Sequence, residues 1–191
     1  AMIGIVTDCG GGRTQLPALL QWSVKQTDGE PCDSFSVQFA CGKKTVSILE
    51  GATEFQAIEA GKVVFTGIVD DFELRLGTDG ALAEITGRGM AGKLMDMQTP
   101  AAEYVSAHLE DILNAYVRPC GITKIEAEEM GAVANFVVQT GATCYQALAG
   151  FCRHSANIFP RFLADGTLVL KRQAAGKAAQ LRSEILQAQY V

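Results

Sequence analysis

The 191-residue sequence predicts an α+β protein in which strands come first and helices follow. In the first half, apolar and polar residues alternate over short segments that end at glycine-containing turns, which is typical of antiparallel strands. In the second half, apolar residues recur at helical spacing. Apolar residues make up 48% of the chain and charged residues 19%, which indicates a folded protein with a hydrophobic core.

The early strands are predicted from period-two alternation. Trp22 and Val24 share one face of their segment, and Phe35, Val37 and Phe39 share one face of the next. We expect the aromatic residues of these segments to pack in the core rather than to stack on a nucleic acid, because no basic stripe accompanies them.

Two further segments complete the predicted sheet. Residues 44–49, with the β-branched Val46 and Ile48, indicate another strand. The long segment 63–76 carries Gly67 and Asp70-Asp71 near its middle, which predicts a bend or bulge, and 78–80 predict a hairpin turn into 81–87. Consecutive strands without intervening helices predict an antiparallel sandwich or barrel.

The second half changes period. Ser106 is a predicted helix cap, and the stripe that follows it comprises Leu109, Ile112, Leu113, Tyr116 and Val117. Thr143 and Gln146 form a capping-box pair for a second helix that ends near His154. A short strand is predicted at 135–140, a hairpin around 164–166, a linker at 174–180 and a last strand within 182–191.

Charge and cysteine usage exclude several classes of protein. The net charge is −5, and residues 1–99 contain 13 acidic against 8 basic residues, so binding to nucleic acid through a basic surface is not expected. No apolar run is long enough to span a bilayer. No C-x-x-C pair occurs among the cysteines, which indicates reduced thiols in a cytosolic protein; they are Cys9, Cys32, Cys41, Cys120, Cys144 and Cys152.

Residues Gly87 to Lys93 satisfy two nucleotide-binding patterns, G-x-G-x-x-G and G-x-x-x-x-G-K. The first pattern requires a parallel βαβ unit, whereas the preceding segments predict antiparallel hairpins. The second requires Ser or Thr after the lysine to bind Mg²⁺, and this chain has Leu94. We therefore interpret the glycines as giving backbone freedom where a strand ends, with Met90, Leu94 and Met97 anchoring a short helix; a nucleotide-dependent enzyme remains an alternative.

No residue is predicted to be catalytic, to bind a cofactor or to ligate a metal, and the chain is not expected to be an enzyme. Cys152 and His154 are too few for a metal site, and Cys152 falls on the apolar stripe of its helix. Asp70 and Asp71 should point to opposite faces of a strand, so they cannot act together on one substrate. Glu126, Glu128 and Glu129 indicate a solvated loop or helix face.

Four segments, in order, resemble the baseplate hub proteins of contractile phage tails, the late control protein D family and the Mu-type hub. They are "CDSFSVQF" (32–39), "VFTGIVDDFEL" (64–74), "ITGRGMAGKLMDMQTP" (85–100) and "VQTGATCYQALAGFCRHSANIFPRFLADGTLVLKR" (138–172). The third resembles a family motif in which a barrel strand enters a short helix, although Gly89 stands where serine is usual.

The resemblance implies a domain organisation. Residues 2–98 would form an antiparallel β-barrel (tube-like) domain, 99–176 a small α+β domain with two helices and a hairpin, and 177–191 the start of a second barrel that is incomplete here. Because family members are longer than 191 residues, the chain is expected to be a truncated or short divergent form.

The resemblance also implies a role. The protein would be a structural component of a phage or prophage tail baseplate hub, located in the virion and assembled in the bacterial host cytoplasm. The full-length form would be a homotrimeric ring that joins the tail tube to the spike, and DNA would pass through its acidic lumen without specific binding. A type VI secretion or tailocin spike-hub component with the same fold is the alternative.

Overall fold

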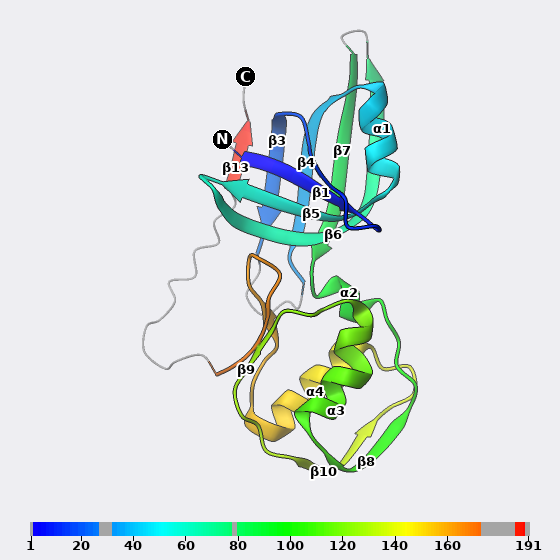
Figure 1. The fold of residues 1–191 in the computed structure, drawn as a ribbon, viewed down its shortest axis with the longest axis vertical. Helices are drawn as coiled ribbons and strands as arrows, with labels where there is room; N and C mark the ends of the chain where they lie inside the picture. Colours follow the sequence, from blue (N-terminus) through cyan, green and yellow to red (C-terminus); the bar gives the residue numbers. More distant parts are fainter. Residues whose placement is uncertain (1, 27–31, 78–79, 173–185, 190–191) are drawn as a thin grey trace. The chain divides into compact units, whose positions relative to one another are not determined.

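The computed structural model describes residues 2–26, 32–77, 80–172 and 186–189. The chain divides into two compact units (Figure 1). The first contains the residues up to Met90, the tripeptide Ala164–Gly166 and the segment with the last strand, whereas the second contains Ala91–Leu163 and the segment that begins at Thr167. Each unit has its own hydrophobic core.

The first unit is an eight-stranded sheet in which every neighbouring pair is antiparallel. Its order is β13-β3-β4-β7-β6-β5-β1-β2. The strands are β1 (Met2–Asp8), β2 (Arg13–Gln15), β3 (Leu19–Lys25), β4 (Ser34–Cys41), β5 (Ala52–Glu59), β6 (Lys62–Gly77), β7 (Gly80–Gly89) and β13 (Leu186–Gln189).

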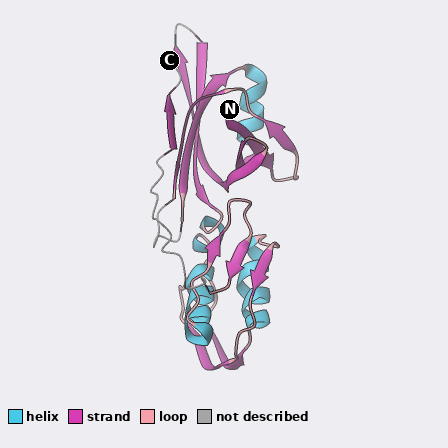
Figure 2. Ribbon diagram, turned by 90° about the vertical axis from the view of Figure 1, so that its left-hand side faces the viewer, coloured by secondary structure: helices cyan, strands magenta, loops and turns pink. Residues whose placement is uncertain are grey.

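The sheet curves strongly around its own core (Figure 2). Val6 of β1, Trp22 of β3, Phe39 of β4 and Phe55 of β5 all belong to this one cluster. The predicted antiparallel sheet and the predicted burial of the aromatic residues are thus confirmed. Within the described ranges, however, no hydrogen-bonded pair joins β2 to β13, so these strands do not form a closed barrel.

The predicted strand at 44–49 is wrong, because these residues lie in helix α1 (Lys43–Glu50) between β4 and β5. Gly42 caps the helix, and Leu49 is buried in the core of the sheet while Ile48 packs partly against it. The β-branched residues Val46 and Ile48 favour a strand only weakly, and packing of an apolar helix face overrides that preference.

The predicted bulge in the long strand is confirmed at Asp70. Val69 pairs with Gly87 and Asp71 pairs with Thr86, so Asp70 is the extra residue on β6. The turn at 78–80 lies partly outside the described residues, but β6 and β7 remain paired as far as Gly77 and Gly80, which confirms the hairpin.

Gly67 and Gly87 allow β6 and β7 to approach closely beside this bulge. A Cβ atom on Gly87 would lie 1.9 Å from the carbonyl oxygen of Ile68 and 2.6 Å from the ring of Phe35. A Cβ atom on Gly67 would lie 2.2 Å from the carbonyl oxygen of Arg88. These glycines are required for space between backbones, whereas the sequence suggested a bend or bulge near Gly67 and backbone freedom at a strand end for Gly87.

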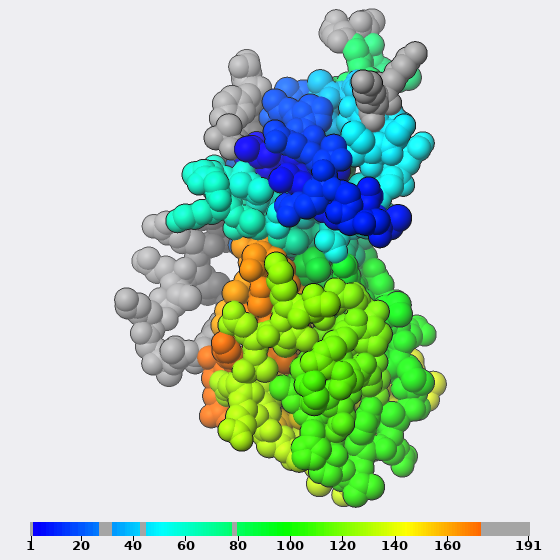
Figure 3. Space-filling model, viewed as in Figure 1, coloured from blue at the N-terminus to red at the C-terminus, as the bar shows by residue number. Residues whose placement is uncertain are grey.

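The second unit combines helices with two small sheets. Its helical elements are α2 (Gly92–Met95), α3 (Leu109–Ile112), the π-helical turn η1 (Leu113–Val117), the 3-10 turn η2 (Arg118–Cys120) and α4 (Cys144–Ala156). Its strands are β8 (Ala102–Ala107), β9 (Ile125–Ala127), β10 (Val133–Val138), β11 (Arg161–Phe162) and β12 (Leu168–Leu170). In Figure 3, the segment that carries α3 is drawn in green and forms much of the surface of this unit that is turned toward the viewer.

The strands of this unit pair in two groups. Antiparallel strands β8 and β10 form one sheet. In the other, β12 pairs antiparallel with β11 and parallel with β9. The predicted strand near 135–140 and the predicted hairpin around 164–166 are therefore confirmed, whereas the linker at 174–180 lies outside the described residues.

The predicted apolar stripe is confirmed, but its helix starts later than expected. Ser106 lies in β8, and His108 is the residue that caps α3. The backbone N–H of His108 donates to Asp111 Oδ2 at 2.9 Å. Four residues of the stripe are buried, and these are Ile112, Leu113, Tyr116 and Val117.

Helix α4 begins with the predicted capping box. The backbone N–H of Gln146 donates to Thr143 Oγ1 at 3.1 Å, and that of Thr143 donates to Gln146 Oε1 at 2.9 Å. Two otherwise unsatisfied donors at the helix start thus gain partners. The helix ends at Asn157, whose φ of 54° is left-handed, and it buries Leu148, Phe151 and Cys152 completely.

We predict that Gly87→Ala destabilises the protein by about 3 kcal/mol or more, because the new methyl group would overlap the backbone of β6. Gly77→Ala is the matched control on the same hairpin, since a Cβ there would meet only Gly80 O, at 3.7 Å. Urea unfolding followed by circular dichroism measures both free energies. Equal stabilities for the two variants would contradict the close approach.

We predict that Thr143→Ala lowers the free energy of unfolding by about 1 kcal/mol, because the hydroxyl that accepts from Gln146 is lost. Thr143→Ser keeps the hydroxyl and should restore most of this stability. Thermal unfolding of both variants tests the prediction, and a serine variant as unstable as the alanine variant would show that the methyl group matters instead.

Candidate functional site

The nucleotide-like motif begins in the sheet, with Gly87 to Gly89 in β7, and continues through a turn to Gly92 and Lys93 in α2. Gly87 belongs to β7 and pairs with Phe35 of β4 and Val69 of β6. The backbone N–H of Gly89 donates to Asp33 O at 2.8 Å. A phosphate loop needs free backbone N–H groups at the start of a helix, whereas here Gly87 and Gly89 lie in a strand and the N–H of Gly89 is bound to Asp33. This geometry argues against nucleotide binding.

Helix α2, which begins within the motif at Gly92, has only four residues. Its apolar anchors are partly as predicted. Leu94 is fully buried and Met90 is 8% exposed, whereas Met97 is 49% exposed and therefore does not anchor the helix. Lys93 lies beside Gly121, since a Cβ on that glycine would be 3.8 Å from Lys93 Nζ.

His154 contacts the backbone of its own helix, and Cys152 packs in the core of the second unit. Nδ1 of His154 is 2.7 Å from the carbonyl oxygen of Gly150, one helical turn earlier. Cys152 is fully buried in the core of the second unit, and burial raises the pKa of its thiol to about 12. A thiol in this state is a poor nucleophile. In the part of the chain that the structure describes, no group of three His, Cys, Asp or Glu side chains converges as a metal site requires.

Asp70 and Asp71 have different interaction partners. Asp70 makes a two-pronged ion pair with Arg88, at 2.7 Å to Nε and 2.8 Å to Nη2. Asp71 instead accepts a hydrogen bond at 2.8 Å from the backbone N–H of Phe72. The two carboxylates therefore do not form a catalytic pair.

The glutamate cluster lies on a strand and beyond it, not on a helix. Glu126 of β9 accepts a hydrogen bond from Lys171 Nζ at 2.7 Å, and Glu128 pairs with Arg172 at 3.2 Å. These ion pairs connect the chain after β12 to β9 and are exposed. Glu126 and Glu128 therefore each have a basic partner.

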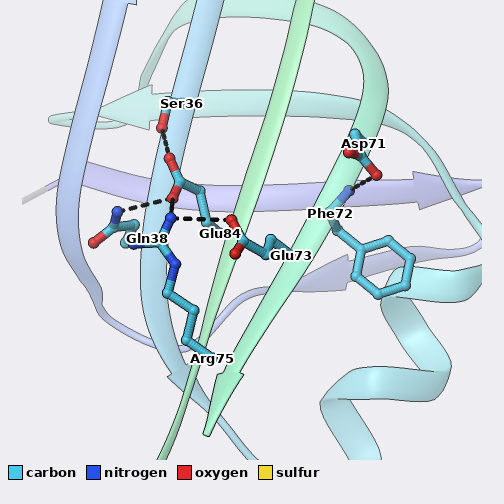
Figure 4. A network of polar contacts seen from close by, with 7 residues as sticks. All are labelled: Ser36, Gln38, Asp71, Phe72, Glu73, Arg75 and Glu84. Atoms are coloured by element: carbon cyan, nitrogen blue, oxygen red, sulfur yellow. Dashed lines mark hydrogen bonds and ion pairs between the residues drawn. The ribbon is translucent and has the colours of Figure 1, made fainter.

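A polar network on the open face of the sheet was not foreseen from the sequence. Glu84 of β7 accepts hydrogen bonds from Ser36 Oγ at 2.8 Å and from Gln38 Nε2 at 3.0 Å, both on β4 (Figure 4). Arg75 of β6 lies 3.3 Å from the second oxygen of Glu84 and donates to Glu73 at 3.0 Å. The network thus links three neighbouring strands.

Arg75 lowers the pKa of a glutamate in this network. The hydrogen bond from Arg75, and then its charge, hold the pKa of Glu73 below its ordinary value. The Glu84 side chain is only 20% exposed, whereas those of Glu73 and Arg75 are 62% and 58% exposed. Alternation along β4 predicts that Ser36 and Gln38 share a face, but nothing in the sequence sets the register that places Glu84 between them.

The face that carries this network offers satisfied hydrogen bonds rather than a reactive group. Carboxylate, amide, hydroxyl and guanidinium groups bind one another across β4, β7 and β6. Such an arrangement suits a wall or a docking face, since general acid–base chemistry needs a group poised to exchange protons with a substrate. No described helix combines the length and the apolar character needed to cross a bilayer.

We predict that Glu84→Ala lowers the free energy of unfolding by about 1 to 2 kcal/mol, because Ser36 and Gln38 lose a charged acceptor on a half-buried face. Glu73→Ala is the control, since its side chain is exposed and should change stability little. Denaturant titration compares the two, and a larger loss for the Glu73 variant would contradict this ranking.

Comparison with known proteins relates this fold to tail proteins. No family model matches the chain, and no curated protein matches it in sequence. Among solved structures, a tail protein from Neisseria meningitidis is 22% identical with a TM-score of 0.68, and 88% of this chain aligns to 51% of that one. A 43 kDa tail protein of prophage MuSo2 from Shewanella oneidensis is 16% identical with a TM-score of 0.69, and 93% aligns to 57%.

A third similar structure comes from a secretion system. An E. coli component of the type VI secretion system, described as similar to bacteriophage T4 tail proteins, is 13% identical with a TM-score of 0.51. Here 79% of this chain aligns to 44% of the other. The chain therefore spans about half the length of the proteins it resembles, and it has the fold of phage tail proteins and of their type VI secretion counterparts.

Proposed function

We propose that the protein is a structural component of a phage or prophage tail baseplate hub, without enzymatic activity. The observation that carries this proposal is the similarity of nearly the whole chain to two tail proteins, at TM-scores of 0.68 and 0.69. The local pairing of the acidic groups and the burial of Cys152 support a structural role, because they leave these groups poorly suited to catalysis.

In this proposal the full-length protein is a homotrimeric ring that joins the tail tube to the spike, in the baseplate of the virion. Residues 2–98 would form its first tube-like barrel and 99–176 the small α+β domain. Residues 177–191 would begin a second barrel. Within this last segment, β13 is an edge strand of the first sheet, where it pairs with β3.

The experiment is a measurement of mass and binding on the full-length protein. Native mass spectrometry should give three copies, and co-purification should recover the tube and spike proteins of the same particle. Gly87→Ala should lose assembly along with folding, while Gly77→Ala should retain both. A folded protein that stays monomeric and binds neither tube nor spike would overturn the proposal.

The type VI secretion or tailocin alternative has its own support in the E. coli component, which shares the fold at a lower TM-score of 0.51. The genes beside this one discriminate between the particles. Sheath, tube and tail-fibre genes would favour a phage or a tailocin, whereas genes for a membrane-anchored secretion complex would favour the alternative. Capsid and terminase genes would in turn distinguish a phage from a tailocin.

We further propose that the acidic first half faces a lumen through which DNA passes without specific binding. If so, Asp70→Asn should slow DNA ejection from assembled particles. Because Asp70 is paired with Arg88, Arg88→Gln is the necessary companion, since it breaks the same ion pair but increases net negative charge.

Opposite effects of the two variants on ejection rate would support a role for lumen charge. Equal slowing would assign the effect to the ion pair itself, and unchanged ejection in both would contradict the lumen assignment. Particle yield and tail length, measured by electron microscopy, control for assembly defects.

A further inference from the structure

A row of exposed side chains follows the edge strand β11 of the second unit. Phe159, Arg161 and Leu163 are exposed, whereas the residues between them are buried or half-buried. Side chains two residues apart on an extended segment point to the same side, so these three share one face. The Phe159 ring is 63% exposed. An exposed aromatic ring beside an arginine is typical of surfaces that contact other proteins.

A second arginine belongs to the same surface. The guanidinium of Arg153, on α4, lies 5.5 Å from the centre of the Phe159 ring, which is a cation–π contact. We call the surface made by Arg153, Phe159, Arg161 and Leu163 the arginine patch. It joins two positive charges to two exposed apolar side chains.

The charges of this patch are not compensated within the described part of the chain. Several other basic side chains bind carboxylates, and these are Arg75, Arg88, Arg118, Lys171 and Arg172. Among the described residues, neither Arg153 nor Arg161 has a carboxylate partner. The acid in the same row as Arg161 is Glu126, two strands away, and it already binds Lys171 at 2.7 Å. The patch therefore fits an acidic partner.

A surface of opposite charge lies on the first unit, along the second half of β6. The pairing of β6 with β5 ends at Ile68, so from Asp71 onward the side of β6 away from β7 has no strand partner among the described residues. The carboxylate of Asp71 accepts from the backbone N–H of Phe72 and binds no described basic side chain (Figure 4). Leu76 is 87% exposed, and Leu74 is also exposed. We call Asp71, Leu74 and Leu76 the β6 edge.

We propose that the arginine patch of one copy of the protein docks on the β6 edge of a second copy, with Arg161 against Asp71 and Phe159 against the two leucines. The inference rests on the proposed function, which requires a ring of copies. Both surfaces combine apolar groups with charge, and the charges have opposite sign, which gives the contact its specificity.

The position of the two surfaces suits a ring. They are different surfaces on different units of the same chain, so each copy offers one and accepts the other. Such head-to-tail contacts generate closed rings when the rotation between copies closes. A nucleic acid fits the arginine patch less well, because the chain has a net charge of −5 and the patch has two arginines rather than a basic stripe.

The test measures how readily the full-length protein dissociates on dilution, by native mass spectrometry. Arg161→Glu and Asp71→Lys should each raise the concentration of half dissociation about tenfold or more, because each places like charges against each other. Lys62→Glu is the control, since it changes the net charge as Arg161→Glu does but alters an exposed residue outside both surfaces. Circular dichroism should show that all three variants are folded.

The charge exchange decides whether the two surfaces meet. A chain that carries both Arg161→Glu and Asp71→Lys should associate nearly as the wild type does, since the ion pair is restored with its partners exchanged. Phe159→Ala should weaken association without any change of charge. If the wild type forms a ring, single variants that associate normally, or an exchange that fails to restore association, would overturn this inference and leave the proposed function standing. A folded wild-type protein that is monomeric would overturn both.

Discussion

The close approach of β6 and β7 at two glycines is the constraint on which the first unit depends. A side chain at Gly87 would collide with the backbone of the facing strand at Ile68, and the ring of Phe35 occupies the space above the glycine. That ring stacks on Phe55 with centroids 4.5 Å apart and tilts against Phe65 at 5.3 Å. The missing side chain thus makes room for the aromatic cluster that joins β4 to β5 and β6, and the curvature of the sheet follows from this contact.

The bulge at Asp70 works together with these glycines. Because side chains alternate along a strand, one extra residue reverses which side of the sheet the remainder of β6 presents. With the bulge, Glu73 stands opposite Glu84, and Arg75 binds both carboxylates on the polar face. Without it, Glu73 would point toward the buried face. The ion pair between Asp70 and Arg88 forms at the bulge itself. The inserted residue has no partner in the strand pairing, but its carboxylate binds this arginine.

The sequence predicts those elements whose signals are local. Period-two alternation identifies the buried face of β4, and the Thr143–Gln146 pair identifies the start of α4, because each depends on neighbours along the chain. The sequence does not predict an element correctly where contacts with residues far away in the chain decide its secondary structure. Val46 and Ile48 have strand-forming side chains, yet they lie in α1, which packs on the sheet. Ser106 has the side chain of a cap, yet pairing with Ala134 holds it in β8. The role of Gly87 likewise requires the fold, since the backbone atom that a side chain there would meet belongs to another strand.

The same dependence on distant partners explains why a chain with two nucleotide-binding patterns has the fold of a tail protein. A phosphate loop leaves its backbone N–H groups free at a helix start, whereas the central position of β7 requires those groups for the ladders to β4 and β6. The glycines cannot meet both demands, because a strand held on both sides has no donors left for a ligand. A sheet of this kind has two surfaces that a partner can contact. One is its polar face, whose register is set by the bulge, and the other is its edge strands. A polar face and edge strands of this kind fit the structural role that we propose.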